Sequence, residues 1–414
     1  MFLLKLATLN IFRNTKRSIL TMTTVFVGVF GFIMASGMVN GVEQTYVRIE
    51  IDTETAHLRV MHKRYLSEEE NFPLDLLLPQ QRAVHSVIKK GWPTALVVPR
   101  IIFSAQLGDG EQALGARGVA IDSALAEKAF SLSRYSSSKK PLPETGKWIF
   151  VGSIIAKSFK KKIGDTLTIE SRTRDGSMNA DDYQIAGVIS TGNMIIDGGS
   201  FYIPLKSARD LLRMPTGLTD VVVKLPKKQD ALLVSTRLQK QFGAVQAQTW
   251  QDKTRTIFEL NKIRRQMFNV LISIILIVAA AGMANTVLMS AFERKGEIGM
   301  MMALGMPEGR IVRLFTAEAG MLGLIGSVFG ALCGGSWAYY LQVYGWDISA
   351  MVEKTYGATG QTTGLSVASF IFFDISFSTI LMGIFLGVFV SLLASLWPAW
   401  RTTRFDPREV LARS

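Results

Sequence analysis

Four long apolar stretches dominate this 414-residue sequence, one near its beginning and three in its last third. Each has about 20 or more residues, the length that an α-helix needs to cross a hydrocarbon core roughly 30 Å thick. We place them at 18–40, 268–290, 314–341 and 376–397. Backbone polar groups in lipid must be hydrogen-bonded within the protein, so these stretches are expected to be helices. The sequence therefore predicts an integral membrane α-helical protein with four transmembrane helices.

The basic residues in the short flanks predict its orientation. The amphipathic segment 1–17, the segment 291–313 and the tail 398–414 each carry four Lys or Arg residues, whereas the loop 342–375 carries one. The first three segments are therefore expected in the cytoplasm, and the loop outside it. Three basic residues at 262–265 disagree, but long translocated domains weaken the rule.

The first stretch has a second interpretation. Small residues at Ala35–Gly37 follow the apolar run, as they do at the cleavage site of a signal peptide. The run is longer than a usual signal sequence and a basic amphipathic stretch precedes it, which favours a retained membrane anchor.

Residues 41–267 are expected to form a large external α/β domain. Short β-rich runs such as 58–61 and 220–225 alternate with helical patterns such as 79–90 and 228–242. The domain carries 33 Lys and Arg against 24 Asp and Glu, so it holds most of the net charge of +13. This charge favours either a solvated surface or attraction to anionic lipid headgroups, and with membrane spans present we expect no nucleic-acid partner.

An apolar stripe continues from the external domain into the second span. Leu260, Met267, Val270 and Ile274 follow helical spacing, and no glycine or proline interrupts the pattern before Gly282. The second membrane helix is therefore expected to extend outward as a stalk. The alternative is that the stripe only packs on a neighbouring helix.

The third span is rich in glycine. Gly323, Gly326 and Gly330 stand three and four residues apart, a spacing that lets helix backbones approach closely in lipid. This predicts tight helix packing, within the chain or across a dimer.

A search for catalytic motifs is negative. The sequence has no phosphate-binding G-x-x-x-x-G-K-[ST] loop, no H-E-x-x-H motif and no G-x-S-x-G turn. Its three histidines have no acidic or cysteine partners at ligand spacing, and its single cysteine, Cys333, excludes an intrachain disulfide. Glu318 is the clearest charge inside a span, whereas a proton pathway normally needs several. We expect no catalytic residue, metal or cofactor.

The segment 291–313 is the most informative part of the chain. Glu293, Arg294 and Glu297 are expected on the exposed side of a short helix, while Ile298 and Leu304 belong to an apolar side. Gly305 and Pro307 end the pattern. The segment is predicted either to dock into a groove on a cytosolic partner or to lie among the lipid headgroups.

Several motifs, taken in order, resemble the MacB/FtsX/LolC-type ABC transporter permeases. One follows the second span, and another, with a proline-alanine step, basic residues and Pro-x-x-x-Leu, lies in the tail. The resemblance covers essentially the whole chain. The motifs are Glu293–Gly305, Trp397–Leu411, Val151–Ser153, Ala156–Lys157, Ile163–Asp165, Ile185–Val188, Gly192–Asp197 and Tyr202–Leu205.

The resemblance implies a MacB-type external domain and a non-catalytic subunit that works by mechanotransmission. It would form a homo- or heterodimer with a second permease subunit, bound to two copies of a cytosolic ABC ATPase that holds ATP and Mg. The segment that couples it to the ATPase would include Glu293, Arg294, Glu297, Ile298, Gly299, Leu304 and Gly305.

Within the family, the domain length and Thr249–Trp250 before the stalk resemble the lipoprotein-releasing LolC/LolE subunits of Gram-negative inner membranes. The cargo would then be a lipoprotein or similar lipid, passed toward the outer membrane with a periplasmic chaperone or adaptor. Methionine adapts to irregular apolar guests. An acyl-chain cavity is therefore predicted around Met34, Met38, Met267 and Val270.

Three other functions stay open. One is a MacB-like export subunit with a periplasmic adaptor, and another is an FtsX-like regulator of a periplasmic hydrolase. A membrane enzyme is the third, which the negative motif search disfavours.

Overall fold

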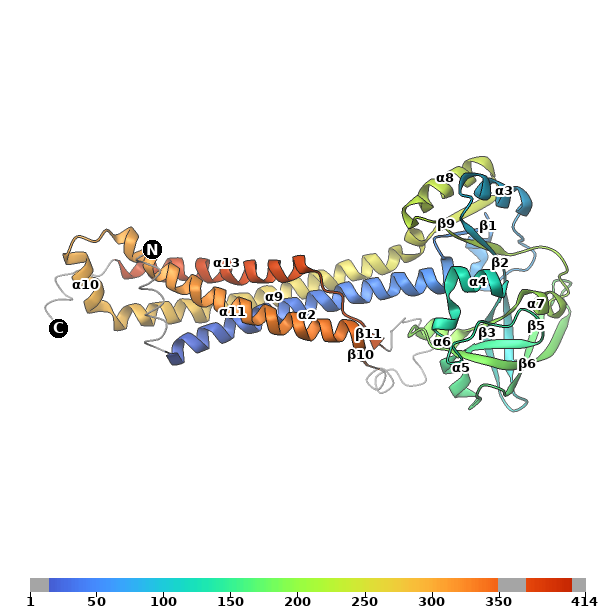
Figure 1. Ribbon diagram of the computed structural model, residues 1–414, viewed down its shortest axis with the longest axis horizontal. Coiled ribbons are helices and arrows are strands. Elements are labelled where there is room, and N and C mark those ends of the chain that lie inside the picture. The colour runs from blue at the N-terminus through green and yellow to red at the C-terminus, as the bar shows by residue number, and fades with distance from the viewer. Residues whose placement is uncertain (1–14, 349–369, 404–414) are drawn as a thin grey trace. The chain divides into compact units, whose positions relative to one another are not determined.

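The computed structural model describes residues 15–348 and 370–403 (Figure 1). It divides into two compact units. We call 1–44, 259–346 and 371–414 the membrane unit, and 45–258 with 347–370 the external domain. Parts of the predicted cytoplasmic segment 1–17, loop 342–375 and tail 398–414 lie outside the described residues.

Four helices in the described part of the chain are long and apolar enough to cross a membrane. They contain the first three predicted spans and all of the fourth except residue 376, which caps the start of its helix, and they extend beyond the predicted spans at the other ends. The helix α9 has 44 residues, about 66 Å at the usual rise, so the stripe from 254 to 267 and the second span belong to one unbroken helix. The helices are α2 (Thr15–Ile49), α9 (Trp250–Glu293), α11 (Glu308–Tyr344) and α13 (Phe377–Thr402).

Exposed aromatic side chains gather in the last turns of α11 and of α13, two helix ends that are expected on opposite sides of the membrane. Trp337, Tyr340 and Tyr344 lie in the last turns of α11, and Trp397 and Trp400 in the last turns of α13. Trp and Tyr are enriched at both membrane–water interfaces. This distribution fits the predicted spans 314–341 and 376–397, although the limits of the membrane stay a prediction.

Helix α11 packs through its glycines. A Cβ atom on Gly326 or Gly330 would lie 2.7 or 2.8 Å from the carbonyl oxygens of Met22 and Phe26 in α2. A Cβ atom on Gly323 would overlap the side chain of a serine in α13. The structure thus places all three glycines at helix contacts within the chain.

The external domain contains a nine-stranded mixed sheet in the order β3-β7-β4-β6-β5-β2-β8-β1-β9. Because β2 also pairs with β3, six of these strands close into a ring, and β8, β1 and β9 extend from the first half of β2. The strands are β1 (Leu58–His62), β2 (Leu96–Gly108), β3 (Ala113–Ile121), β4 (Trp148–Gly152), β5 (Thr166–Arg172), β6 (Met178–Ile189), β7 (Ser200–Pro204), β8 (Asp220–Lys224) and β9 (Val245–Thr249).

Helices cover the sheet and complete its core. Val84 and Ile88, four residues apart in one helix, share a buried face because a helix turns once in 3.6 residues. In β5, buried Leu167 and Ile169 alternate with more exposed residues, as expected of a strand with one covered face. The helices are α3 (Gln81–Gly91), α4 (Ser123–Phe130), α5 (Ser153–Ser158), α6 (Met194–Gly199), α7 (Leu205–Leu211) and α8 (Ala231–Gln241).

Shorter elements link these parts. The outer end of α2 continues as a π-helix, η1 (Glu50–Thr55), and then enters β1. Three 3₁₀-helices, η2 (Tyr65–Asn71), η3 (Leu132–Arg134) and η4 (Lys228–Asp230), lie in the external domain. The two-residue strands β10 (Trp346–Asp347) and β11 (Phe370–Ile371) pair with each other.

Candidate functional site

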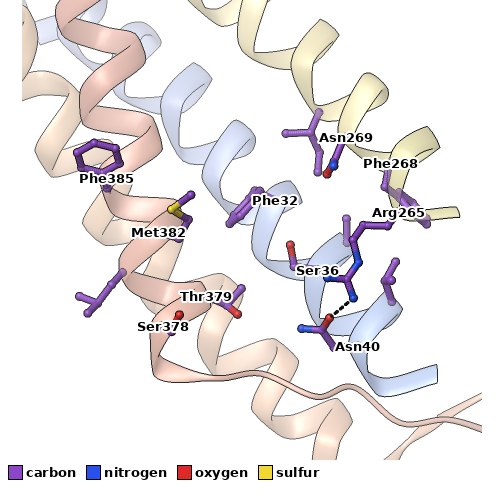
Figure 2. Close-up of a pocket in the computed structure, with 14 residues that line it drawn as sticks. Phe32, Ser36, Asn40, Arg265, Phe268, Asn269, Ser378, Thr379, Met382 and Phe385 are labelled. Atoms are coloured by element: carbon purple, nitrogen blue, oxygen red, sulfur yellow. Dashed lines mark hydrogen bonds between the residues drawn. The ribbon is translucent and has the colours of Figure 1, made fainter. Parts of the chain in front are cut away.

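A groove of about 640 Å³ opens in the membrane unit between α2, α9 and α13 (Figure 2). Its lining residues recur at helical spacing, so one stripe of each helix faces it. They are Phe32, Ala35, Ser36, Val39 and Asn40 of α2, Arg265, Phe268, Asn269 and Ile272 of α9, and Ser378, Thr379, Leu381, Met382 and Phe385 of α13.

The groove has a polar end and is mostly apolar along the rest of its length, where Ser36 and Asn269 are the polar exceptions. Asn40, Arg265 and Ser378 lie toward the ends of their helices expected on the outer side. Phe32 and Phe385 lie further along the same helices, toward the predicted cytoplasmic side. A site of this kind suits a ligand with an apolar chain and a polar head, because binding sites are mostly apolar with a few placed polar groups.

Arg265 is the charged group at the polar end. Its guanidinium donates to Asn40 Oδ1 at 3.1 Å and to Glu43 at 3.4 Å. The Arg265 side chain is 53% exposed and is one of the residues that line the groove. Arg265 belongs to the basic run that disagrees with the orientation rule, and the structure gives this residue a local acidic partner.

The four residues predicted to line a cargo cavity are not among those that line this groove. Met34 and Met38 pack against the core of the helix bundle, on another face of α2. Met267 and Val270 are exposed, next in sequence to groove residues of α9. Met267 and Val270 thus lie beside the groove and Met34 and Met38 lie on another face of α2, and a cargo role for the four residues stays a prediction.

The predicted coupling segment contains α10 (Lys295–Ala303), between the ends of α9 and α11 (Figure 1). Glu293, Glu297, Leu304 and Gly305 are exposed. Gly305 follows the end of α10 with φ of +83°, a conformation that glycine adopts without a steric penalty.

Two other predicted coupling residues face inward. Ile298 and Gly299 are buried, and Ile298 belongs to the core of the bundle. They therefore hold α10 on the membrane unit and do not form part of its exposed surface. The apolar residues that are exposed are Phe292, Met300 and Leu304, the last at 82%. These three residues are eight and four residues apart, a helical spacing that sequence analysis could have used to find the exposed apolar surface. Periodicity alone does not say which side of α10 packs inward.

Arg294 links the coupling segment to α11. It lies at the break between α9 and α10, and its guanidinium donates to Glu297 at 3.1 Å and to Glu318 at 3.3 Å. The side chains of Arg294 and Glu318 are 12% and 15% exposed. The charge inside the third span therefore forms an ion pair that fixes the start of α10, and Arg294 itself is largely covered.

Two of the three histidines accept hydrogen bonds from backbone amides. His57 Nδ1 accepts a hydrogen bond from the Leu225 amide at 3.1 Å, and His62 Nδ1 accepts one from the Arg64 amide at the same distance. Across residues 15–348 and 370–403, no group of three or more His, Cys, Asp or Glu is placed to hold a metal ion.

Comparisons with protein families match both units. Residues 18–241 match the MacB-like periplasmic core domain, and residues 269–407 match the C-terminal region of FtsX-like permeases. The first match covers more than half of the chain.

Similar curated proteins are distant in sequence. The chain is 21% identical over 275 residues to the lipoprotein-releasing system transmembrane protein LolC of Neisseria meningitidis, and 25% identical over 274 residues to LolE of Haemophilus influenzae. Each match covers 64% of this chain and 64% of the relative, just under two thirds of its length. The macrolide export ATP-binding/permease protein MacB of Salmonella choleraesuis is 26% identical over 221 residues, which cover 51% of this chain and 30% of MacB.

Proposed function

Because the chain belongs to the family with a MacB-like periplasmic core domain and an FtsX-like permease C-terminal region, we propose that it is the non-catalytic transmembrane subunit of an ABC transporter. A separate cytosolic ATPase, in two copies, binds and hydrolyses ATP. The subunit transmits the resulting movement to its external domain and extracts lipoproteins, or similar lipid cargo, from a bacterial inner membrane.

The groove between α2, α9 and α13 carries the cargo part of the proposal. Its apolar length can cover an acyl chain, and each buried CH₂ group contributes about 0.8 kcal/mol. Its polar end supplies Arg265, Asn40 and Ser378 for the ester or amide groups where acyl chains meet a polar head. The names of the LolC and LolE relatives agree with a lipidated cargo.

The surface of the coupling segment supports the ATPase part. Phe292, Met300 and Leu304 expose apolar side chains beside the exposed acids Glu293 and Glu297. Exposed apolar side chains that lie beside charged ones, at the end of α9 and along α10, suit docking into a groove on a partner. The ion pair of Arg294 with Glu318 anchors that surface to α11, so a movement of the ATPase would reach the membrane helices.

The exposed side of α9 supports a second permease subunit. Ile274, Ile277 and Val278 are each more than half exposed, while a different stripe of α9 packs on the bundle. In the proposed transporter this exposed side faces lipid or the second subunit, which is either an identical or a related chain.

The experiment is an affinity pull-down of the tagged chain from its native membrane in mild detergent, with mass spectrometry of the retained proteins. We expect an ABC ATPase and acylated lipoproteins with the unchanged chain. Changing Glu293→Lys together with Glu297→Lys reverses the charge of the docking surface, so the ATPase should be lost while the chain still inserts.

The control carries the same charge change on the external domain. Glu111→Lys with Glu144→Lys alters two exposed acids, and this variant should retain the ATPase. Recovery of the ATPase with the Glu293/Glu297 variant would show that this surface is not the docking site. Absence of any ATPase from the unchanged chain would overturn the proposed function.

The MacB relative and the MacB-like match over residues 18–241 favour a second candidate, an export subunit that works with a periplasmic adaptor. The same pull-down separates the two. An adaptor without lipoproteins would favour export, and a cell-wall hydrolase would favour an FtsX-like regulatory role.

A further inference from the structure

A chain of ion pairs crosses the external domain from the start of α9 to the strands β1 and β8. Lys253 Nζ of α9 lies 3.6 Å from Glu69 Oε2 of η2. The other oxygen of Glu69 accepts a hydrogen bond from Arg59 of β1, and Arg59 also donates to Asp220 of β8. Arg59 and Glu69 are 10 residues apart, but Lys253 and Asp220 come from segments distant in sequence, so the fold brings these two to the pair.

The same chain of contacts continues to the outer end of α2. Arg100 of β2 donates to both oxygens of Asp220, at 3.1 and 2.7 Å, and to the backbone carbonyl of Glu54 in η1 at 2.6 Å. The Glu54 carboxylate accepts two hydrogen bonds from Arg117 of β3, one of them at 2.9 Å. We call Lys253, Glu69, Arg59, Asp220, Arg100, Glu54 and Arg117 the ion-pair chain.

The middle of the ion-pair chain is sealed from solvent. Arg59, Arg100 and Asp220 are 3%, 1% and 0% exposed. Burial opposes ionisation of Asp220, but Arg100 and Arg59 outweigh it and hold the pKa of the Asp220 carboxyl below its usual value. The Asp220 carboxyl group is therefore charged at neutral pH.

Such a buried network is a poor way to gain stability. Desolvation of the ions offsets their attraction, and well-packed apolar residues in their place are often as stable or more so. What ion pairs with paired hydrogen bonds supply is fixed geometry, because the planar guanidinium group accepts few orientations of its partner. The best physical reason for this network is therefore the position that it imposes.

The contact with Glu54 shows which position is imposed. The carbonyl of Glu54 lies in the last turn of a helix, where carbonyl groups have no partner within the helix. Arg100 satisfies this carbonyl and Arg117 holds the side chain of the same residue. The end of α2 is thus held by two strands, β2 and β3, and not by apolar packing alone.

We propose that the ion-pair chain is a joint that fixes the outer ends of α2 and α9 at one separation on the sheet. Its members are positioning residues. Both helices continue into the membrane unit, so a movement of either one reaches the external domain together with the other. This last consequence rests on the proposed function, whereas the fixed separation does not.

The test measures the separation directly in the full-length chain, without ATPase or cargo. Spin labels are attached to cysteines at the exposed positions Arg48 of α2 and Thr256 of α9, with Cys333→Ser to remove the native thiol. Double electron–electron resonance then gives the distribution of distances between the labels. We expect a single narrow peak, and loss of that peak in Arg117→Gln, which breaks the contact with Glu54.

A second variant separates geometry from stability. This variant replaces the three buried charges by apolar residues, with the changes Arg59→Met, Arg100→Met and Asp220→Leu. Its midpoint of thermal unfolding should equal or exceed that of the unchanged chain. We expect the narrow peak to be lost in this variant as well. If it does not fold, Glu54→Gln replaces it, because that change removes one charge and preserves the shape, and the same loss is expected.

The matched control is Lys147→Gln, which removes the exposed ion pair between Lys147 and Asp181 elsewhere in the domain and should leave the peak unchanged. A narrow peak that survives in Arg117→Gln and in the folded second variant would overturn the proposal, since the network would then only stabilise the fold. Failure of the ATPase pull-down would leave this result unaffected, so the two proposals fail independently.

Discussion

Helices α11 and α9 are both long and apolar enough to cross a membrane, yet they are held in opposite ways. In the most apolar 18-residue window of each helix, 56% of the residues of α11 are buried in the chain, against 11% for α9. Helix α11 touches α2 and α13 through glycines along its length. Helix α9 packs through one narrow stripe and is tethered by polar contacts such as Arg265–Asn40, Thr21–Thr286 and Arg294–Glu318.

The difference concerns how firmly each helix is held by its neighbours in the membrane unit. In lipid there is little hydrophobic gain from bringing helices together, so close backbone contact and polar contacts decide which helices associate. Glycines allow close backbone contacts between α11 and its neighbours, so this helix is firmly held in the bundle. Helix α9 relies mainly on polar contacts, and it borders the groove and continues into the external domain. In the proposed transporter, we therefore expect α9 to be the helix that moves and that contacts the cargo.

The largest expected effect comes from filling the backbone contact of α11. Gly330→Leu places a side chain where Phe26 of α2 lies, and a clash with backbone cannot be relieved by a rotamer change. We expect loss of folded, monodisperse protein in size-exclusion chromatography. Gly282→Leu in α9 is the control, because a Cβ atom added there has no neighbouring atom within 4 Å. This variant should change the free energy of unfolding by no more than about 0.5 kcal/mol. Equal losses in both variants would contradict the contrast between the two helices.

A smaller effect is expected at the inner tether of α9. Arg294→Gln leaves the largely covered carboxylate of Glu318 without its partner, and breaking such pairs costs several kcal/mol when they are fully buried. Since both groups retain some exposure, we expect the free energy of unfolding to fall by about 2 kcal/mol, which would be measured as a lower unfolding midpoint in detergent. We also expect the pull-down to retain less of the ATPase. The exposed Arg310→Gln should change neither quantity. An unchanged midpoint in Arg294→Gln would mean that the tether does not hold α10.

The smallest effect on stability is expected in the groove beside α9. Ala35→Trp adds a large side chain where space already exists, so the unfolding free energy should change by less than about 1 kcal/mol, in contrast to Gly330→Leu. The same change should reduce recovery of acylated lipoproteins in the pull-down, because it occupies the apolar length of the groove. Leu332→Trp, at an exposed position of α11 outside the groove, should leave this recovery unchanged. Undiminished recovery with Ala35→Trp would place the cargo elsewhere.

How far the sequence leads depends on the range of the interaction that decides each feature. The glycines of α11 were recognisable because their spacing is local, but only the structure separates Gly326 and Gly330, against α2, from Gly323, against α13. In the coupling segment, the exposed acids and Leu304 fit the expected docking surface, whereas Ile298 and Gly299 turn inward. The ion-pair chain left no signal, because most of its paired members are far apart in the sequence, 184 residues in the case of Glu69 and Lys253.

The sequence by itself determined four apolar segments of membrane-spanning length, an α/β region between the first and second, a helix that runs from 254 to 290 and a short segment after it that ends near Gly305 and Pro307. These follow from local rules, since lipid sets the length and polarity of each span and backbone hydrogen bonds set its helical period. Tertiary structure alone decided the rotation of each helix, and with it the groove between α2, α9 and α13, the inward face of α10 and the joint at the ends of α2 and α9. Rotation depends on which partner each side chain meets, and those partners are brought together only by the fold.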